Sequence, residues 1–228
     1  MNQGKMEPLQ SNERGKILIK VAKTLDEINQ CTTLISEVYY QQYGITFSDS
    51  ISDPEAKIES YPQYYLMALS CETVVGTVGL YTAGTNVEKY GNVTEEDIKK
   101  VLLEAKAIDR FPGKVRELTK WVVKKEWRSK EIARVLLSAA LSQDFLHINE
   151  KEPHVIVASG SSSIFKFAKT FNVRIRKIKL MPLYKVHENY RFHEHPLEIF
   201  LTIPDIDIPK ELYLAKLPFE YISAKLNL

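Results

Sequence analysis

The sequence from Glu117 to Leu137 reads ELTKWVVKKEWRSKEIARVLL, and it decides how the rest of the chain is interpreted. Its first seven residues are rich in β-branched and aromatic side chains, a composition that favours a half-buried strand. From Ile132 onward, apolar residues return at every third or fourth position, which is typical of one face of a helix. The basic segment KKEWRSK joins the two. The stretch therefore predicts a strand, a basic loop and a helix in direct succession.

The basic loop and the start of the following helix form a candidate anion site. The helix is expected to begin near Ser129, so its first backbone N–H groups point into the loop. These N–H groups and the helix dipole attract anions, and neighbouring cations strengthen the attraction, which suits a phosphate. An ordinary strand–loop–helix unit with a solvated charged turn explains the same pattern.

The composition is that of a globular protein, because 44% of the 228 residues are hydrophobic and 26% are charged. The chain is long enough for one domain with additions, and it has no apolar run of the length that a membrane span needs. Its polar start lacks the apolar core of a secretory signal. Cys31 and Cys71 lack metal-site spacing, and a reduced, cytoplasmic location is expected.

Positive charge gathers in two segments, although the whole chain has a net charge of only +2. Residues 110–134 contain nine lysines and arginines against three glutamates, and residues 174–191 contain six against one. Such clusters on a nearly neutral chain indicate a local anionic partner, and no zinc-finger or RNP-type motif points to nucleic acid. His187, His193 and His195 have acidic neighbours, but a strand-edge connection explains them better than a metal site does.

Periodicity and turn residues predict an α/β domain over residues 17–203, between a flexible lead of residues 1–16 and a helical tail of residues 204–228. The expected strands are 17–22, 64–70, 73–82, 117–123, 154–158, 174–180 and 197–203. The expected helices are 24–43, 94–106, 129–149 and 164–171, the first two opened by capping boxes of Thr24 with Glu27 and Thr94 with Asp97. A long acidic loop is expected over residues 44–62, and a turn over residues 159–163.

The pattern V-x-x-E-x-R-x-x-x-I-x-x-x-L-L, from Val123 to Leu137, resembles the acyl-donor loop of the GNAT acyltransferase superfamily, V-x-P-E-x-R-G-x-G-I-G-x-x-L-L. The resemblance implies an α/β fold with a mixed, mostly antiparallel central sheet flanked by helices, and an acyl donor carried on pantetheine. In the family, loop glycines let backbone amides wrap a coenzyme A pyrophosphate. Here Ser129, Glu131 and Ala133 stand at the glycine positions, and the carboxylate of Glu131 repels a pyrophosphate.

A narrower resemblance concerns RELTKWVV, from Arg116 to Val123, which is similar to the stretch W-E-V-S-R-F-A-V of acyl-homoserine lactone synthases. It is also similar to the corresponding strand of N-acyl amino acid synthases. The resemblance implies an acyl carrier protein as donor, Glu117 as the base that helps to deprotonate an acceptor amine, and a cation at Lys120. The arginine that the lactone synthases have after V-G-T is missing, because VGL stands at 78–80, which favours an acceptor such as an amino acid over S-adenosylmethionine.

The chemistry of acyl transfer also makes Glu117 a candidate, since a carboxylate beside the acceptor can take the proton of an amine. Strand alternation places four side chains on one face, namely Glu117, Thr119, Trp121 and Val123. A bulge would disrupt this alternation of side chains, and bulges are frequent next to active sites. The alternative is an exposed glutamate paired with Arg116 or Lys120.

These observations predict an N-acyltransferase that moves an acyl group from acyl carrier protein, or from acyl-coenzyme A, to the amine of a small molecule such as an amino acid. An acetyl-coenzyme A-dependent N-acetyltransferase and a GNAT-fold module that binds without turnover are the alternatives. An acidic carrier protein is expected on the basic segment Lys124–Arg134, and no metal, permanently bound cofactor, nucleic acid or membrane is expected. The expected donor-binding residues are Trp121, Val122, Val123, Lys124, Arg128, Ser129, Lys130, Ile132 and Ala133. Tyr39, Asp53 and Lys120 are expected on the acceptor side.

Overall fold

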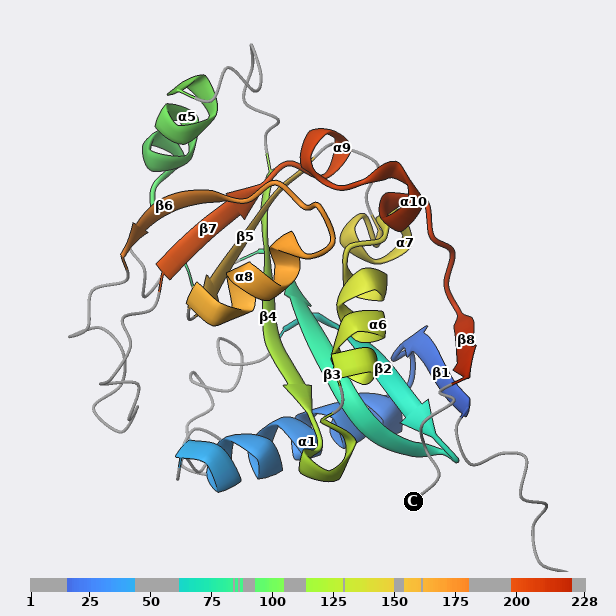
Figure 1. Cartoon of the computed structure of the whole chain (residues 1–228). Helices are drawn as coiled ribbons and strands as arrows, with labels where there is room; N and C mark the ends of the chain where they lie inside the picture. The colour runs from blue at the N-terminus through green and yellow to red at the C-terminus, as the bar shows by residue number, and fades with distance from the viewer. Residues whose placement is uncertain are drawn as a thin grey trace, which may run out of the picture.

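A mixed sheet of eight strands forms the centre of the molecule (Figure 1). The computed structural model describes residues 16–43, 62–83, 85, 87, 93–104, 114–128, 130–149, 154–160, 162–180 and 198–222. The strand order is β6-β7-β5-β4-β3-β2-β1-β8, in which β4 and β5 run parallel and all other neighbours run antiparallel. The bounds are β1 Lys16–Val21, β2 Tyr64–Ser70, β3 Thr73–Tyr81, β4 Lys114–Val123, β5 His154–Gly160, β6 Arg176–Leu180, β7 Glu198–Thr202 and β8 Phe219–Ile222.

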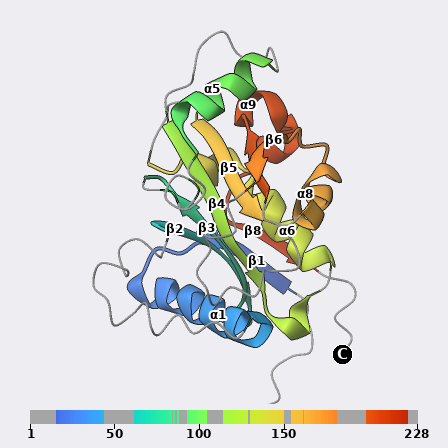
Figure 2. The ribbon, with the colours of Figure 1, turned by 90° about the vertical axis from the view of Figure 1, so that its left-hand side faces the viewer.

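Helices cover both faces of the sheet. In Figure 2, α1 and α5 lie on one side of the sheet and α6 and α8 lie on the other. We call these sides the α1 face and the α6 face. The predicted α/β architecture, with a mostly antiparallel sheet flanked by helices, is confirmed. The bounds are α1 Leu25–Tyr43, α5 Glu95–Glu104, the 3-10 turn η1 Lys125–Trp127, α6 Lys130–Ala140, α7 Gln143–Leu146, α8 Ser162–Lys169, α9 Pro204–Asp207 and α10 Lys210–Tyr213.

Both predicted capping boxes are present. The hydroxyl of Thr24 accepts a hydrogen bond from the Glu27 N–H at 3.2 Å, and the Glu27 carboxylate accepts one from the Thr24 N–H at 3.2 Å. Thr94 and Asp97 make the same reciprocal pair at 3.1 and 2.9 Å. Each box satisfies backbone donors that a helix start leaves open, so α1 and α5 begin where the local sequence indicates.

The long helix predicted over residues 129–149 is wrong, because the chain breaks after Ala140 into α6 and the short α7. Ser142 lies between them, fully buried, and its hydroxyl donates to the carbonyl oxygen of Ala139 at 2.7 Å. A serine hydroxyl that bonds to nearby backbone competes with helix continuation. The turn predicted over residues 159–163 is also displaced, since Ser159 and Gly160 belong to β5 and pair with β7.

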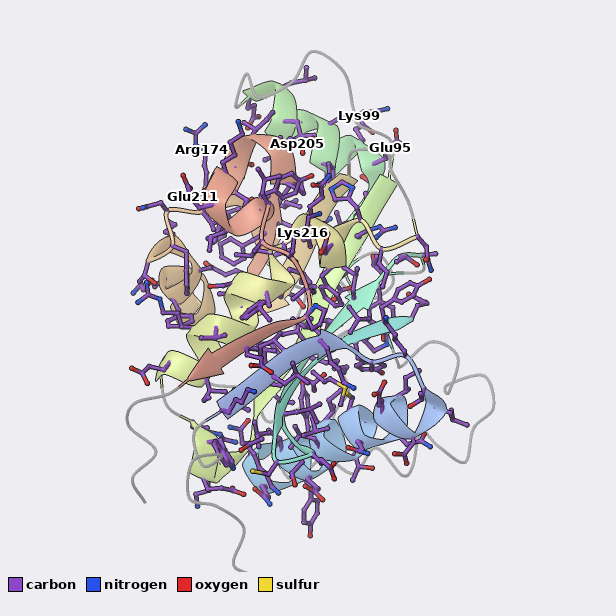
Figure 3. All side chains as sticks on the ribbon, turned by 90° about the vertical axis from the view of Figure 1, so that its right-hand side faces the viewer. Glu95, Lys99, Arg174, Asp205, Glu211 and Lys216 are labelled. Atoms are coloured by element: carbon purple, nitrogen blue, oxygen red, sulfur yellow. The ribbon has the colours of Figure 1, made fainter. Side chains whose placement is uncertain are left out.

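The C-terminal segment adds to the sheet as well as to the helices. Short helices were expected after residue 203, and α9 and α10 are there, but β8 was not predicted. β8 pairs with β1 as the last strand of the sheet. The segment before it is held by Asp144 of α7, whose carboxylate binds Lys216 at 2.9 Å and the Leu217 N–H at 2.9 Å. Figure 3 labels Lys216 on the stretch that leads to β8.

The core has layers on both faces of the sheet because neighbouring strand residues point to opposite sides. On β2, Leu66 and Ala68 pack with residues of α6, whereas Tyr65 and Met67 pack with residues of α1. All four side chains are at most 1% exposed. The apolar faces of α1 and α6 that the sequence predicts are thus the faces that bury the two sides of β2.

Gly79 of β3 lies close to the ring of Pro62. The sequence predicts that Gly76 and Gly79 admit a backbone or a ligand, and at Gly79 the neighbour is the ring of Pro62. A Cβ atom added to Gly79 would lie 2.2 Å from Pro62 Cγ. At Gly76 the nearest atom would be Leu136 Cδ2, at 3.2 Å.

We therefore expect Gly79→Ala to lower the free energy of unfolding by about 1–3 kcal/mol, because the Pro62 ring must move. Gly76→Ala is the matched control on the same strand, and it should cost less because a flexible leucine side chain can yield. Urea unfolding of the two variants measures the difference. Equal midpoints would contradict the assignment of Gly79 to the Pro62 contact.

Candidate active site

The sheet opens at its centre, where β4 and β5 separate. The two strands pair only from Lys114 opposite His154 to Glu117 opposite Val157. Beyond that point β4 continues to Val123 beside β3, while β5 continues beside β7. We call the end of the β4–β5 pairing, at Glu117 and Val157, the fork. Past the fork, within the described residues, β4 pairs only with β3 and β5 pairs only with β7.

A bulge in β4 lies just past the fork. Thr77 is opposite Val122 but Gly79 is opposite Thr119, so β4 holds one residue more than β3 over this stretch. Lys120 is in the left-handed region with φ 51°, a conformation that costs about 1–2 kcal/mol for a residue with a side chain. Such strain is common at functional sites, and bulges re-aim side chains there.

The bulge makes the predicted alternation of β4 wrong, because the strand changes phase at Lys120. Glu117, Lys120 and Val122 lie on the α1 face, since their contacts are the Val87 N–H, the Tyr39 ring and the α1 cluster respectively. Side chains on the α6 face are Leu118, Trp121 and Val123, which pack with α6 or with the residues beneath α8. The predicted base and the predicted donor residue Trp121 therefore face opposite sides of the sheet.

Glu117 and Lys120 form a charged pair on the α1 face. Glu117 is fully buried, and its Oε2 atom accepts a hydrogen bond from the Val87 N–H at 3.0 Å. Lys120 Nζ lies 5.1 Å from the centre of the Tyr39 ring, a cation–π contact. Burial lowers the pKa of Lys120 to about 8, and the negative charge of Glu117 opposes that shift. A buried carboxylate, a titratable amine and an aromatic ring are thus brought together at the fork.

Two of the three residues predicted on the acceptor side, Tyr39 and Lys120, are in contact. The third, Asp53, lies outside the described residues, as does the rest of the predicted loop 44–62. The contact joins the C-terminal half of α1 to the bulge of β4. Local sequence patterns place these residues on separate elements and do not show that they meet.

Aromatic side chains line the α6 face past the fork. The Trp121 and Phe167 rings stack with centroids 5.6 Å apart, and Phe167 meets Phe171 edge-on at 5.6 Å. The guanidinium of Arg134 lies 5.3 Å from the centre of the Phe171 ring. Figure 1 shows α8, which carries Phe167, lying across β4 on this face. The aromatic row thus runs from β4 to a cation of α6, and no sequence pattern distinguishes the two phenylalanines.

Two residues of the basic loop after β4, Lys124 and Arg128, make contacts within the protein. Lys124 pairs with Glu126 at 3.6 Å. Arg128 donates from Nε to the Val123 carbonyl oxygen at 3.0 Å. With the Gln42 amide oxygen turned towards it, the Arg128 guanidinium also donates two bonds of 2.7 and 2.8 Å to Gln42. These contacts tie the loop to the end of α1, a role of Arg128 that the sequence did not predict.

Two of the other predicted donor-site residues pack in or against the core, and the side chains of two more lie outside the described part of the chain. Ile132 is only 2% exposed and belongs to the core beneath α6, while Ala133 is half-buried against that core. Ser129 lies outside the described residues, and so does the side chain of Lys130. The start of α6 follows β4 as predicted, but Ile132 contributes to packing.

Arg116 was expected only as a possible partner of Glu117, and its actual position was missed. Its side chain is 1% exposed on the α6 face, where it donates to the carbonyl oxygens of Leu146 at 2.6 Å and Ile148 at 3.1 Å. These are carbonyls at the end of α7, which a helix leaves open for a cation. Arg116 thus attaches β4 to α7 beside Glu117, and nothing in its spacing signals this.

The described part of the chain lacks both a cluster of metal ligands and a helix that could cross a membrane. No group of three or more His, Cys, Asp or Glu there could hold a metal ion. The histidines at 187, 193 and 195 lie outside the described residues. None of the described helices combines the length and apolar composition that crossing a membrane requires. Both cysteines are free thiols, with Cys31 buried and Cys71 exposed in the β2–β3 turn.

The forked sheet and its helices match solved structures of enzymes that transfer acyl groups. FeeM, an N-acyl amino acid synthase from uncultured soil microbes, has a TM-score of 0.55 at 12% identity, over 84% of this chain and 93% of that one. BjaI, a CoA-dependent acyl-homoserine lactone synthase with SAM and isopentyl-CoA, has 0.54 at 13% identity, over 86% and 85%. No family model and no curated protein sequence matches. At such identities the likeness establishes the fold, and the predicted GNAT-like fold is confirmed.

Proposed function

We propose that the protein is an N-acyltransferase that moves an acyl group from a pantetheine thioester to the amine of a small molecule such as an amino acid. The observation that carries the proposal is the forked sheet with a buried carboxylate, Glu117, at its apex. Solved structures with the same fold include an N-acyl amino acid synthase and an acyl-homoserine lactone synthase. The bulge separates two sets of groups that such a reaction needs, one polar and one apolar.

The polar set serves the acceptor. Glu117 takes a proton from the acceptor ammonium, so that the neutral amine can attack the thioester carbonyl. A C–N bond forms, the C–S bond breaks, and the pantetheine thiolate leaves. The second proton that the nitrogen loses passes to solvent, which protonates the thiolate to the free thiol. A thiol of pKa about 8.5 is a competent leaving group, so the step proceeds without an assigned general acid. Lys120, beside Glu117, supplies a cation for the carboxylate of an amino acid acceptor.

The apolar set serves the donor. Leu118, Trp121 and Phe167 line the α6 face past the fork and suit an acyl chain and its pantetheine arm. We favour an acidic acyl carrier protein as the donor because Lys125 and Arg134 are exposed beside this face. A carrier protein offers one phosphodiester, which Glu131 repels less than a pyrophosphate. Acyl-coenzyme A is the second donor, since BjaI is CoA-dependent.

A reconstituted reaction tests the proposal. Purified protein is incubated with octanoyl-acyl carrier protein, octanoyl-coenzyme A or acetyl-coenzyme A, each with a mixture of amino acids and simple amines. Mass spectrometry is expected to find an N-octanoyl amino acid, formed fastest from the carrier protein. Lipids from cells that overproduce the protein should contain the same class of product. Formation of N-acetyl amines alone would replace the proposal with an acetyltransferase.

A binding module without turnover is the second candidate, and one observation favours it. Glu117 is fully buried and already accepts a hydrogen bond from the Val87 N–H, as a purely structural carboxylate would. If Glu117 is only structural, the protein binds the donor but consumes no thioester with any amine. The reconstituted reaction therefore separates the two candidates through release of free thiol.

A further inference from the structure

We propose that the indole N–H of Trp121 donates a hydrogen bond to a carbonyl oxygen of the acyl-pantetheine arm, and so holds the donor at the fork. The inference rests on the proposed function for the identity of the donor. It adds a residue that contacts the substrate through its side chain, and it assigns that residue one bond. The carbonyl belongs either to the thioester or to one of the pantetheine amides.

The first observation is an unsatisfied buried donor. Trp121 Nε1 is inaccessible to solvent and has no hydrogen-bond partner in the part of the chain that the structure describes. Leaving a buried donor unpaired costs about 1–3 kcal/mol, and native proteins contain few such groups. A donor of this kind, retained in a native site, is explained when a ligand supplies the acceptor.

The second observation is the place of this donor. Trp121 lies four residues beyond Glu117, on the part of β4 that no longer pairs with β5. The bulge at Lys120 turns its ring to the α6 face, and the stack on Phe167 restrains it there. The unpaired N–H is therefore held beside the opened edge of β4, on the same strand as the proposed base and on the opposite face.

The surroundings indicate what kind of acceptor fits. Leu118, Phe167 and Ala168 pack with Trp121 in one apolar cluster. A carboxylate or phosphate would lose its hydration there, which is costly without a cation, whereas a neutral carbonyl loses far less. The pantetheine arm is uncharged and carries two amide carbonyls besides the thioester. Its chemistry therefore matches an aromatic wall with one N–H donor.

The two tryptophans of the chain allow a matched experiment. Trp121→Phe keeps an aromatic ring that can stack on Phe167, and it removes the indole N–H together with part of the ring area. Trp127→Phe makes the same change in η1, where Trp127 packs against the core beneath α6. The probes are octanoyl-pantetheine, which has the thioester carbonyl, and S-octyl-pantetheine, a thioether without it. Calorimetry measures both dissociation constants for each variant, and thermal melting checks that each variant is folded.

We expect Trp121→Phe to weaken binding about tenfold and Trp127→Phe to leave it unchanged. A loss confined to octanoyl-pantetheine assigns the bond to the thioester carbonyl, and an equal loss for both probes assigns it to an amide. Trp121 is the sole indole in the Trp127→Phe variant, so its emission should shift on binding even if the other variant does not fold. The inference is overturned if Trp121→Phe binds both probes like the wild type, if the emission of Trp127→Phe does not respond, or if the wild type binds neither probe.

The outcomes separate this inference from the proposed function. Amide formation from octanoyl-acyl carrier protein with unchanged probe binding in Trp121→Phe would keep the function and remove Trp121 from it. Probe binding that depends on Trp121, without any amide product, would keep the donor site in a protein that does not catalyse transfer.

Discussion

Replacing Glu117 by glutamine is expected to lower kcat/KM for amide formation about a thousandfold, within the range of general-base catalysis. The amide has nearly the same shape and can still accept the hydrogen bond from the Val87 N–H. It cannot take a proton from an ammonium group. The loss should therefore appear in catalysis and not in folding, and it is measured as thiol release together with product mass.

Glu126→Gln is the matched control for this change. Glu126 is an exposed glutamate of η1, near the same strand, and it pairs with Lys124. Exposed ion pairs contribute about 0–1 kcal/mol, so this variant should keep both stability and activity. A Glu117→Gln protein that melts like the wild type and transfers acyl groups at full rate would show that Glu117 is structural.

Replacing Lys120 by methionine is expected to lower kcat/KM for phenylalanine about thirtyfold, because a half-buried cation for the acceptor carboxylate is lost. Phenethylamine has the same side chain without the carboxylate, and its kcat/KM should change much less. Lys210→Met, at an exposed lysine of α10 with no part in the proposed site, is the control with the same substitution. An equal loss for both substrates would mean that Lys120 acts on Glu117 or on folding and not on a carboxylate.

The same residue predicts a pH dependence with a definite sign. Burial lowers the pKa of Lys120 to about 8, so the side chain is charged below that pH and neutral above it. The ratio of kcat/KM for phenylalanine to kcat/KM for phenethylamine should be highest well below pH 8 and should fall as the pH rises through 8. Lys120→Arg stays charged over this range, so its ratio of kcat/KM for phenylalanine to kcat/KM for phenethylamine should not change with pH. A wild-type preference that does not change between pH 7 and 9.5 would contradict the assignment.

Local patterns were sufficient for most of the elements that carry the site. The capping boxes at Thr24 and Thr94 and the β2–β3 hairpin depend on residues only a few positions apart. The succession of strand, basic loop and helix from Glu117 onward does too. The same stretch also identified Glu117 as the candidate base, although β4 begins at Lys114 and Glu117 lies inside it, not at its start as predicted.

Several features of the site could not be predicted because they depend on distant partners. The bulge at Lys120 is defined by the register of β3 against β4, and the sequence of β4 alone does not predict it. The break after Ala140 and the burial of Arg116 depend on how α7 packs under β4. The apolar row from Trp121 to Phe171 joins β4 to a helix that follows a different strand.

The sequence by itself determined the α/β class, the strand–loop–helix unit and the candidate carboxylate within its strand, because periodicity and capping act within a few residues. Only the tertiary structure decided which face each group serves. In the tertiary structure β4 and β5 separate after Glu117, because β5 continues beside β7 while β4 continues beside β3. The tertiary structure also turned Glu117 and Lys120 to the α1 face and Trp121 to the α6 face, since one extra residue in β4 must bulge when the register of β3 allows it no partner.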